Sequence, residues 1–312
     1  MDYDVAIIGG GVAGIGAAIY SGRFNLKVAL FAETFGGTII LTDVVENYPG
    51  FKRITGYDLA EELKKHMNDY KVDVFEERVN DIKKVGKEFE VKSGERTIKS
   101  KTIIFATGTQ FKKLGVPGED EYANKGVHYC ALCDGAFYKQ KTMAVIGGSD
   151  SAAKEALLLT SWAEKVYIIY RGDKIHPEPI NMERVEKNLK IEIINHTNIK
   201  EIKGDGKKVT HVILDKEYKS SKEFKVDAIF VAIGHNVLSE LPAKLGVKLN
   251  EKKEVIIDRN ARTNVPGVYA CGDLVDTVFK QAITGVAEGV LASYSAYTYI
   301  TDEVIMPTGN NK

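Results

Sequence analysis

The stretch VAIIGGGVAG, residues 5–14, joins a short apolar run to a glycine-rich turn. Gly9, Gly11 and Gly14 fit the pattern G-x-G-x-x-G, and a helix-like run follows over residues 13–20. After a strand and before a helix, the first glycine permits a tight turn, the second lets backbone approach a pyrophosphate, and the third allows close packing. The stretch therefore predicts a dinucleotide-binding unit whose helix N-terminus presents unpaired N–H groups to an anion.

The same succession of elements occurs twice in the chain. The first has a second strand at 28–31; the other has a strand at 143–146, a loop at Gly147 and Gly148, a helix through 159 and a strand at 166–170. Each succession closes with an apolar strand and an Ala-x-Gly that ends at Gly108 or Gly234. Short alternating segments between these strands indicate small antiparallel meanders. We therefore predict an α/β protein with two Rossmann-like three-layer nucleotide-binding domains.

The segment after the second unit lacks a third glycine fingerprint. It offers a turn and strand at 263–270 and a helix at 281–297, which most economically complete the first domain. We place one domain at residues 1–114 and 240–312, and a second, inserted domain at residues 115–239.

Two side chains at equivalent positions distinguish the units. Glu33 ends the second strand of the first unit, where a carboxylate can accept hydrogen bonds from a ribose diol. Arg171 lies at the same distance from Gly147 as Glu33 does from Gly9. An arginine there suits the 2′-phosphate of NADPH, through a charge-assisted hydrogen bond of about 1.5–3 kcal/mol. The alternative for both residues is an ordinary solvated surface charge.

Composition excludes several classes of function. The 43 basic and 43 acidic residues cancel, so no net field favours nucleic acid or an anionic membrane. No apolar stretch approaches the roughly 20 residues that span a bilayer, and the N-terminus lacks the features of a signal peptide. Three cysteines are too few for a disulfide-stapled secreted scaffold. We therefore expect a soluble cytoplasmic protein.

Cys130 and Cys133 form a Cys-x-x-Cys motif, which beside two dinucleotide folds indicates a redox-active pair. The competing interpretation is a structural zinc site. Such a site needs four ligands, and only His128 lies nearby in the sequence. We therefore predict no metal. The third cysteine, Cys271, has no near partner and is interpreted as a packed small residue.

The segment Tyr129-Cys130-Ala131-Leu132-Cys133-Asp134-Gly135 resembles the Cys-Ala-Thr-Cys-Asp-Gly centre of low-molecular-weight thioredoxin reductases, with Leu132 in place of threonine. The likeness covers essentially the whole chain. It includes ENYPG at residues 46–50, the pairs Gly36-Gly37, Gly272-Asp273 and Gln281-Ala282, and GGSDSA at residues 147–152.

The resemblance implies an enzyme that passes electrons from NADPH through FAD and the cysteine pair to thioredoxin or a thioredoxin-like protein. Cys133 would face the flavin, Cys130 would attack the partner disulfide, and Asp134 would move the proton; the alternative for Asp134 is a helix cap. The FAD-binding set would be Gly9, Gly11, Gly14, Glu33, Gly37, Thr38, Asn47, Gly108, Gly272, Asp273, Gln281 and Ala282. The NADPH-binding set would be Gly148, Ser149, Asp150, Ser151, Arg171 and Gly234. The family also implies a homodimer and rotation of the inserted domain.

The second nucleotide site departs from the family pattern. Ser149 replaces a glycine, and its side chain would either crowd the pyrophosphate or donate to it. The His-Arg-Arg-x-x-x-Arg clamp reads YRGDKIH at residues 170–176, so Gly172 and His176 replace two arginines and Asp173 would oppose a phosphate. NADH and ferredoxin therefore stay as alternative donors.

Two further alternatives differ in class. One is a flavin-binding interaction protein whose cysteines are structural or sensory. The other is a reductase of the alkyl hydroperoxide type, which is disfavoured because its additional N-terminal thioredoxin-like domains are not seen in the sequence.

Overall fold

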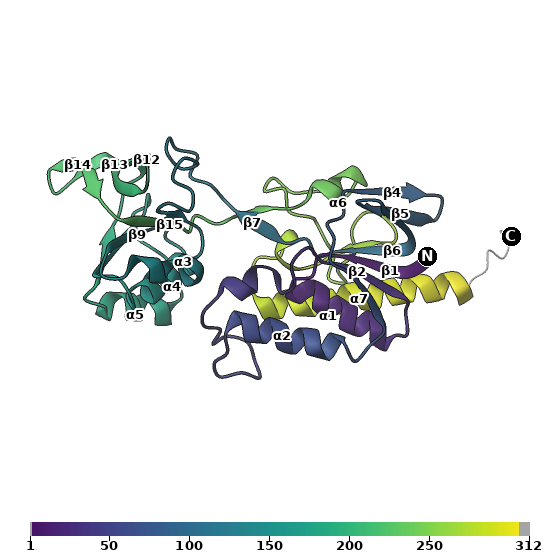
Figure 1. The fold of residues 1–312 in the computed structure, drawn as a ribbon. Helices are drawn as coiled ribbons and strands as arrows, with labels where there is room; N and C mark the ends of the chain where they lie inside the picture. The colour runs from purple at the N-terminus through teal and green to yellow at the C-terminus, as the bar shows by residue number, and fades with distance from the viewer. Residues whose placement is uncertain (1, 306–312) are drawn as a thin grey trace. The chain divides into compact units, whose positions relative to one another are not determined.

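The computed structural model describes residues 2–305 (Figure 1). The chain divides into two compact units, one formed by residues 1–110 with 237–312 and the other by residues 111–236. The crossings expected from the sequence, after residues 114 and 239, lie a few residues beyond these divisions. Residues 306–312 of the first expected domain lie outside the described part.

Unit 1 is built on a seven-stranded sheet of order β3-β2-β1-β6-β5-β4, with β17 also paired to β6. Strands β1, β2, β3, β6 and β17 pair in parallel, whereas β4, β5 and the first half of β6 form an antiparallel meander. The strands are β1 (Asp2–Ile8), β2 (Val28–Phe31), β3 (Val72–Phe75), β4 (Asp81–Val85), β5 (Glu88–Ser93), β6 (Arg96–Phe105) and β17 (Val268–Ala270).

Alternating side chains of β1 divide the core of unit 1 into two layers. Val5 and Ile7 pack in one cluster with α1 (Val12–Arg23) and α7 (Ala282–Ile305). Ala6 and Ile8 belong to a second cluster with the β4–β5 meander. This division follows from the two-residue period of a strand. Figure 1 shows α1, α7 and α2 (Gly56–Met67) along the same side of the unit 1 sheet.

Unit 2 contains a parallel five-stranded sheet of order β11-β10-β9-β15-β8 and a separate antiparallel sheet of β12, β13 and β14. The parallel strands are β8 (Val127–His128), β9 (Thr142–Ile146), β10 (Lys165–Ile169), β11 (Ile191–Ile194) and β15 (Ala228–Val231). The antiparallel strands are β12 (Ile199–Gly204), β13 (Val209–Tyr218) and β14 (Ser221–Lys225).

The side chains of β9, like those of β1, alternate between two core layers. Met143 and Val145 pack with α3 (Ala131–Asp134), α4 (Asp150–Leu159) and α5 (Pro179–Lys187). Ala144 and Ile146 pack with the antiparallel sheet. Each unit is therefore a three-layer Rossmann-like fold, and the prediction of this α/β class is confirmed.

Short elements complete the chain. Two linker strands, β7 (Thr109–Phe111) and β16 (His235–Val237), pair with each other where the chain passes between the units. The remaining elements are α6 (Glu240–Lys244) and the 3-10 turns η1 (Gly37–Leu41), η2 (Gly135–Tyr138) and η3 (Gly272–Leu274).

Candidate active site

The first glycine loop has the geometry that the sequence motif requires. Gly9 follows β1 with φ of +117°, and a Cβ there would lie 2.2 Å from the Ala106 carbonyl oxygen. Helix α1 starts after Gly11 with no side-chain cap, so its first N–H groups have no side-chain acceptor. A Cβ added at Gly11 would meet no protein atom closer than 3.8 Å, so protein packing does not explain this glycine. These features fit a pyrophosphate at the helix N-terminus.

Segments from across unit 1 meet at this loop. The Gly36 N–H donates to the Gly10 carbonyl at 2.8 Å, which seats η1, with Gly37 and Thr38, against the loop. A Cβ at Gly272 would lie 2.9 Å from Ala13, so the start of η3, which contains Asp273, borders α1. The structure thus brings these predicted residues to one edge of the unit.

Asn47 and Gln281 lie far apart in the sequence but are joined by a 3.1 Å hydrogen bond from Asn47 Nδ2 to Gln281 Oε1. Gln281 directly precedes α7, which begins at Ala282. Glu33, just beyond β2, is exposed, and its carboxylate lies 3.7 Å from the Arg78 guanidinium. Such an exposed pair is weak, so Glu33 can exchange it for a ligand.

Glu288 of α7 was missed by the sequence reasoning. Its Oε2 accepts the Gly272 N–H at 2.8 Å, and the Thr277 hydroxyl donates to its Oε1. Burial raises the pKa of this carboxyl above its ordinary value, against the opposing hydrogen bonds. One signal was available, because Glu288 is the sole charged residue between 281 and 301.

The second glycine loop repeats the first in unit 2. Gly147 has φ of +152°, and a Cβ there would lie 2.2 Å from the Ala232 carbonyl oxygen. A Cβ on Gly148 would lie 2.5 Å from the Tyr170 ring. Helix α4 starts after Ser149 without a side-chain cap, so the serine hydroxyl is not used on the helix. Ser151, in the first turn, is exposed.

Asp150 braces α4 against α5. Its Oδ1 accepts the Glu178 N–H at 2.9 Å and the Asn181 amide at 2.8 Å, and its Oδ2 lies 2.8 Å from Lys154 Nζ. Burial acts to raise the pKa of Asp150, but these partners outweigh it and the net pKa falls below its ordinary value. The carboxylate therefore has a structural task in addition to any contact with a nucleotide.

The segment after β10 is held against the second glycine loop. The His176 N–H donates to the Gly148 carbonyl at 2.7 Å, while Arg171 and Lys174 are exposed. Asp173 lies 3.2 Å from His196 Nδ1. Asp173 is exposed, so it stays a like-charged neighbour for any phosphate bound by this segment.

Gly108 and Gly234 border the two linker strands. The Gly108 carbonyl accepts the Leu238 N–H at 3.0 Å, and the Gly234 carbonyl accepts the Lys112 N–H at 3.0 Å. Both glycines have positive φ, at +63° and +95°. They shape the crossings, and the described contacts give no separate sign of nucleotide binding.

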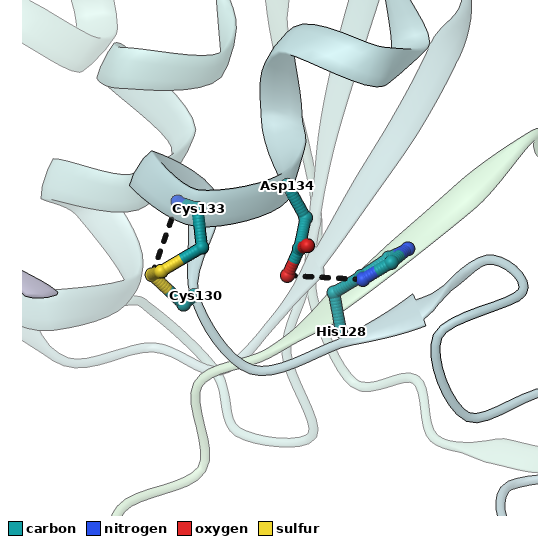
Figure 2. Close-up of a disulfide and its surroundings, with 4 residues drawn as sticks. All are labelled: His128, Cys130, Cys133 and Asp134. Atoms are coloured by element: carbon teal, nitrogen blue, oxygen red, sulfur yellow. Dashed lines mark hydrogen bonds and ion pairs between the residues drawn. A yellow bond between two sulfur atoms is a disulfide. The ribbon is translucent and has the colours of Figure 1, made fainter.

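Cys130 and Cys133 are joined by a disulfide in unit 2. Cys130 caps α3, where its sulfur accepts the Cys133 N–H at 3.1 Å. Cys130 is buried and Cys133 is exposed. The four residues of the motif thus place both sulfurs at the start of one short helix (Figure 2). Cys271 is fully buried, which confirms its interpretation as a packed residue; burial raises the pKa of its thiol.

Asp134 ends α3 and faces His128 of β8, as Figure 2 shows. Asp134 Oδ2 lies 3.1 Å from His128 Nδ1, and the Tyr138 hydroxyl lies 2.8 Å from His128 Nε2. The Nδ1–Oδ2 contact is close but is not aligned as a regular hydrogen bond. Sequence reasoning noted His128 only as an insufficient zinc ligand and did not pair it with Asp134.

Glu119 was also missed. This buried residue accepts the N–H groups of Leu114 and Gly115 at 2.8 and 2.6 Å, and the Tyr129 hydroxyl at 2.7 Å. It therefore ties the incoming linker to the residue that precedes Cys130.

Among the described residues 2–305, no cluster of three or more His, Cys, Asp or Glu side chains is arranged to hold a metal ion. Within the same residues, no helix combines the length and apolar character needed to cross a membrane.

Comparisons with known proteins give a consistent result. The family described as "Pyridine nucleotide-disulphide oxidoreductase" matches residues 3–289. The thioredoxin reductase of Listeria innocua is 39% identical over 96% of this chain and 94% of its own length. The crystal structure of Lactococcus lactis thioredoxin reductase in its FR conformation matches with a TM-score of 0.92 and 37% identity, over 96% of this chain and 99% of that one. The crystal structure of T. acidophilum thioredoxin reductase matches with a TM-score of 0.90 and 36% identity, over 97% of this chain and 99% of that one.

Proposed function

The chain belongs to the pyridine nucleotide-disulphide oxidoreductase family, and on that premise we propose that it is a thioredoxin reductase. It transfers electrons from NADPH through FAD and the Cys130–Cys133 disulfide to the disulfide of thioredoxin or a thioredoxin-like protein. The disulfide at the start of α3, in a unit that also carries a glycine-rich nucleotide loop, is the observation that carries the proposal. The ferredoxin- or NADH-linked alternative is less favoured.

FAD is assigned to unit 1, because the uncapped α1, the open space at Gly11 and the exposed Glu33 suit its adenosine diphosphate half. By the resemblance, the Gly37–Thr38 turn, Asn47, Asp273 and Gln281 hold the remainder. When bound, FAD links a donor that gives hydride to a disulfide that needs two electrons. The hydrogen bond between Asn47 and Gln281 and the hydrogen bond from the Gly272 N–H to Glu288 hold these FAD-binding segments at one edge of unit 1 in the absence of the cofactor.

NADPH is assigned to unit 2. The uncapped α4 receives the pyrophosphate, and Ser149 can donate its free hydroxyl there. Arg171 is exposed at the end of β10, where it can pair with the 2′-phosphate. Asp150 supports this site indirectly, because its hydrogen bonds fix the first turn of α4 against α5.

The exchange with the partner needs two thiol attacks. The Cys130 thiolate attacks the partner disulfide, forms a mixed disulfide and releases the other partner sulfur as a thiolate, which takes up a proton. Cys133 then gives up its proton and attacks the Cys130 sulfur, which frees the second partner thiol and restores the Cys130–Cys133 disulfide. Asp134 carries the proton from the attacking to the departing sulfur. Exposure alone does not assign the two cysteine roles, and the variant Cys130→Ser tests the role given to Cys130.

The cysteine pair and the NADPH loop belong to unit 2, whereas the FAD loop belongs to unit 1. Both must reach one flavin, so we infer that they do so in turn, by rotation about the linker strands β7 and β16. A crosslink between the units should stop turnover and leave one half-reaction intact. Full turnover in the crosslinked protein would exclude the rotation.

We further propose a homodimer, by resemblance, and a cytoplasmic site of action, where a reducing compartment would keep such a pair in redox exchange. The mass of the purified holoprotein, measured by light scattering, tests for the homodimer. A monomeric mass at micromolar concentration would overturn it.

The donor and acceptor are tested together. Anaerobic holoprotein is mixed separately with NADPH, NADH and reduced ferredoxin while flavin absorbance is followed, and thioredoxin is then added. We expect NADPH to bleach the flavin fastest and thioredoxin to be reduced, with turnover lost in Cys130→Ser. Bleaching by ferredoxin alone would identify ferredoxin as the donor. Unchanged turnover in Cys130→Ser would show that Cys130 is not the exchange thiol, and a wild-type protein that does not reduce thioredoxin would leave a flavin-binding interaction protein as the better interpretation.

A further inference from the structure

A second cluster of polar groups lies next to α3. His128 of β8, Asp134 of α3 and Tyr138 of η2 lie together, and His128 is only 4% exposed (Figure 2 shows the first two). Its ring stacks on Phe230 of β15, with centroids 5.4 Å apart and planes at 26°. The imidazole is thus held by the core and cannot follow Asp134 if that side chain moves.

Both ring nitrogens of His128 have polar neighbours. Nε2 lies 2.8 Å from the Tyr138 hydroxyl and Nδ1 lies 3.1 Å from Asp134 Oδ2. An ionised carboxylate can only accept, so Nδ1 must carry the proton to interact favourably with it. Nε2 then has a lone pair and accepts from the Tyr138 hydroxyl. The pair of neighbours therefore selects one neutral tautomer.

The surroundings favour this neutral state. Burial lowers the pKa of His128, and Asp134 opposes that effect without reversing it. Burial, with the nearby carboxylates of Asp134 and Asp227, raises the pKa of Tyr138, so its hydroxyl keeps the proton that it donates.

Other charged groups on neighbouring elements are Lys139 directly after η2, Asp227 directly before β15, and Glu155 on α4. Asp227 accepts the Thr142 N–H at 3.0 Å and lies 3.9 Å from Lys141 Nζ. Glu155 is carried by α4, which packs against α3. No described lysine or arginine is paired with Asp134, which leaves His128 as the partner recorded for that carboxylate within residues 2–305.

We propose that His128 is a positioning residue for Asp134: the short polar contact of its Nδ1–H with Oδ2, although not aligned as a regular hydrogen bond, orients the carboxyl so that Oδ1 stays free to exchange a proton with the thiols, and Tyr138 fixes the tautomer. This inference rests on the proposed function, because it concerns the proton that accompanies thiol exchange. Oδ2 keeps its donor whether or not Oδ1 is protonated, so the carboxyl is held in one orientation throughout the cycle.

The tautomer can be measured in the unaltered holoprotein by long-range ¹H–¹⁵N NMR on histidine-labelled material. Six histidines give few signals, and His128 is assigned by the signal lost in His128→Asn. We expect neutral imidazole protonated at Nδ1 between pH 6 and 8. A proton on Nε2, or a charged ring at pH 7, would overturn the proposal whether or not the protein reduces thioredoxin.

Variants test the consequence for exchange. His128→Ala should lower the thioredoxin turnover number about tenfold, the lower end of what a polar contact with a charged group contributes, and shift the pH of half-maximal turnover upward, with KM for thioredoxin unchanged. His128→Asn, which restores an N–H donor near the Nδ1 position, should recover most of the loss, and Tyr138→Phe should give an intermediate effect. His211→Gln, a histidine of the antiparallel sheet in the same unit, is the matched control and should behave as wild type.

A pH profile and turnover number in His128→Ala within twofold of wild type would refute the positioning role. If His128→Ala does not fold, the turnover of His128→Asn and Tyr138→Phe and the NMR measurement of the tautomer still test the positioning role. Wild-type protein that cannot reduce thioredoxin would instead refute the proposed function, and would leave the tautomer result standing.

Discussion

Glu155 of α4 provides a quantitative test of how unit 2 is built. One of its carboxyl oxygens, Oε2, is buried without a hydrogen-bond partner. It lies on α4 between Ala152 and Leu159, which pack in the same core as Ala131 of α3. Burial raises the pKa of this carboxyl from its ordinary 4.5 to about 8. We therefore expect it to be mainly protonated in the folded protein at neutral pH.

The sign and size of the effect follow from proton linkage. A carboxyl with a raised folded-state pKa stabilises the fold most below its unfolded-state pKa, and this stability is lost as pH rises toward the folded-state value. Between pH 4.5 and 7 the interval is about 2.5 pH units, and at about 1.36 kcal/mol per unit the loss is about 3 kcal/mol. Glu155→Gln removes the ionisation, so over the two pH units from pH 5 to 7 the variant should gain about 2.5 kcal/mol relative to wild type.

Urea unfolding of the holoprotein at pH 5, 6, 7 and 8 measures this difference. Trp162 is the sole tryptophan of the chain and packs against the same core, so its fluorescence follows unit 2. Glu186→Gln, an exposed position on α5, makes the same chemical change without burial and should stay within about 0.5 kcal/mol of wild type throughout. A difference between Glu155→Gln and wild type that does not vary with pH would refute the reasoning.

Three further predictions concern the nucleotide loops. Gly14→Ala should lose bound FAD on gel filtration and destabilise unit 1 by about 1–3 kcal/mol, because the new Cβ would lie 1.9 Å from the Gly9 carbonyl oxygen; retained flavin would contradict the packing. Asp150→Ala should destabilise unit 2 by about 1–3 kcal/mol in the Trp162 assay, since it removes the acceptor for two hydrogen bonds between α4 and the start of α5; unchanged unfolding would show that the brace is unimportant. Arg171→Ala should raise KM for NADPH about tenfold or more and leave KM for NADH nearly unchanged. Equal changes in both KM values would show that Arg171 does not contact the 2′-phosphate.

The strands and helices that bear the glycine loops could be predicted because they depend on short-range patterns. The apolar runs at 28–31 and 228–231 coincide with β2 and β15, and the helix through residue 159 ends there as α4. Boundaries set by tertiary packing were less accurate. The turn and strand expected over 263–270 are present, with the strand at Val268–Ala270, but the helix expected over 281–297 continues to Ile305.

The contacts that complete the candidate site could not be predicted in this way. Asn47 meets Gln281 only because the chain returns after the inserted unit. Glu288 and Glu119 act by accepting backbone N–H groups, a role that leaves no motif. His128 and Asp134 are six positions apart on two successive elements, and the path of the short connection between β8 and α3 brings them face to face.

The proposed activity depends on a sulfur pair that opens and closes in exchange with a bound flavin. Anaerobic dithionite titration of the holoprotein, with flavin absorbance and free thiols followed together, tests this most directly. We predict that wild-type protein takes up twice as many reducing equivalents per flavin as the Cys130→Ser, Cys133→Ser double variant, with two new thiols that disappear again when oxidised thioredoxin is added. Equal uptake by both proteins, with no thiols formed, would contradict it.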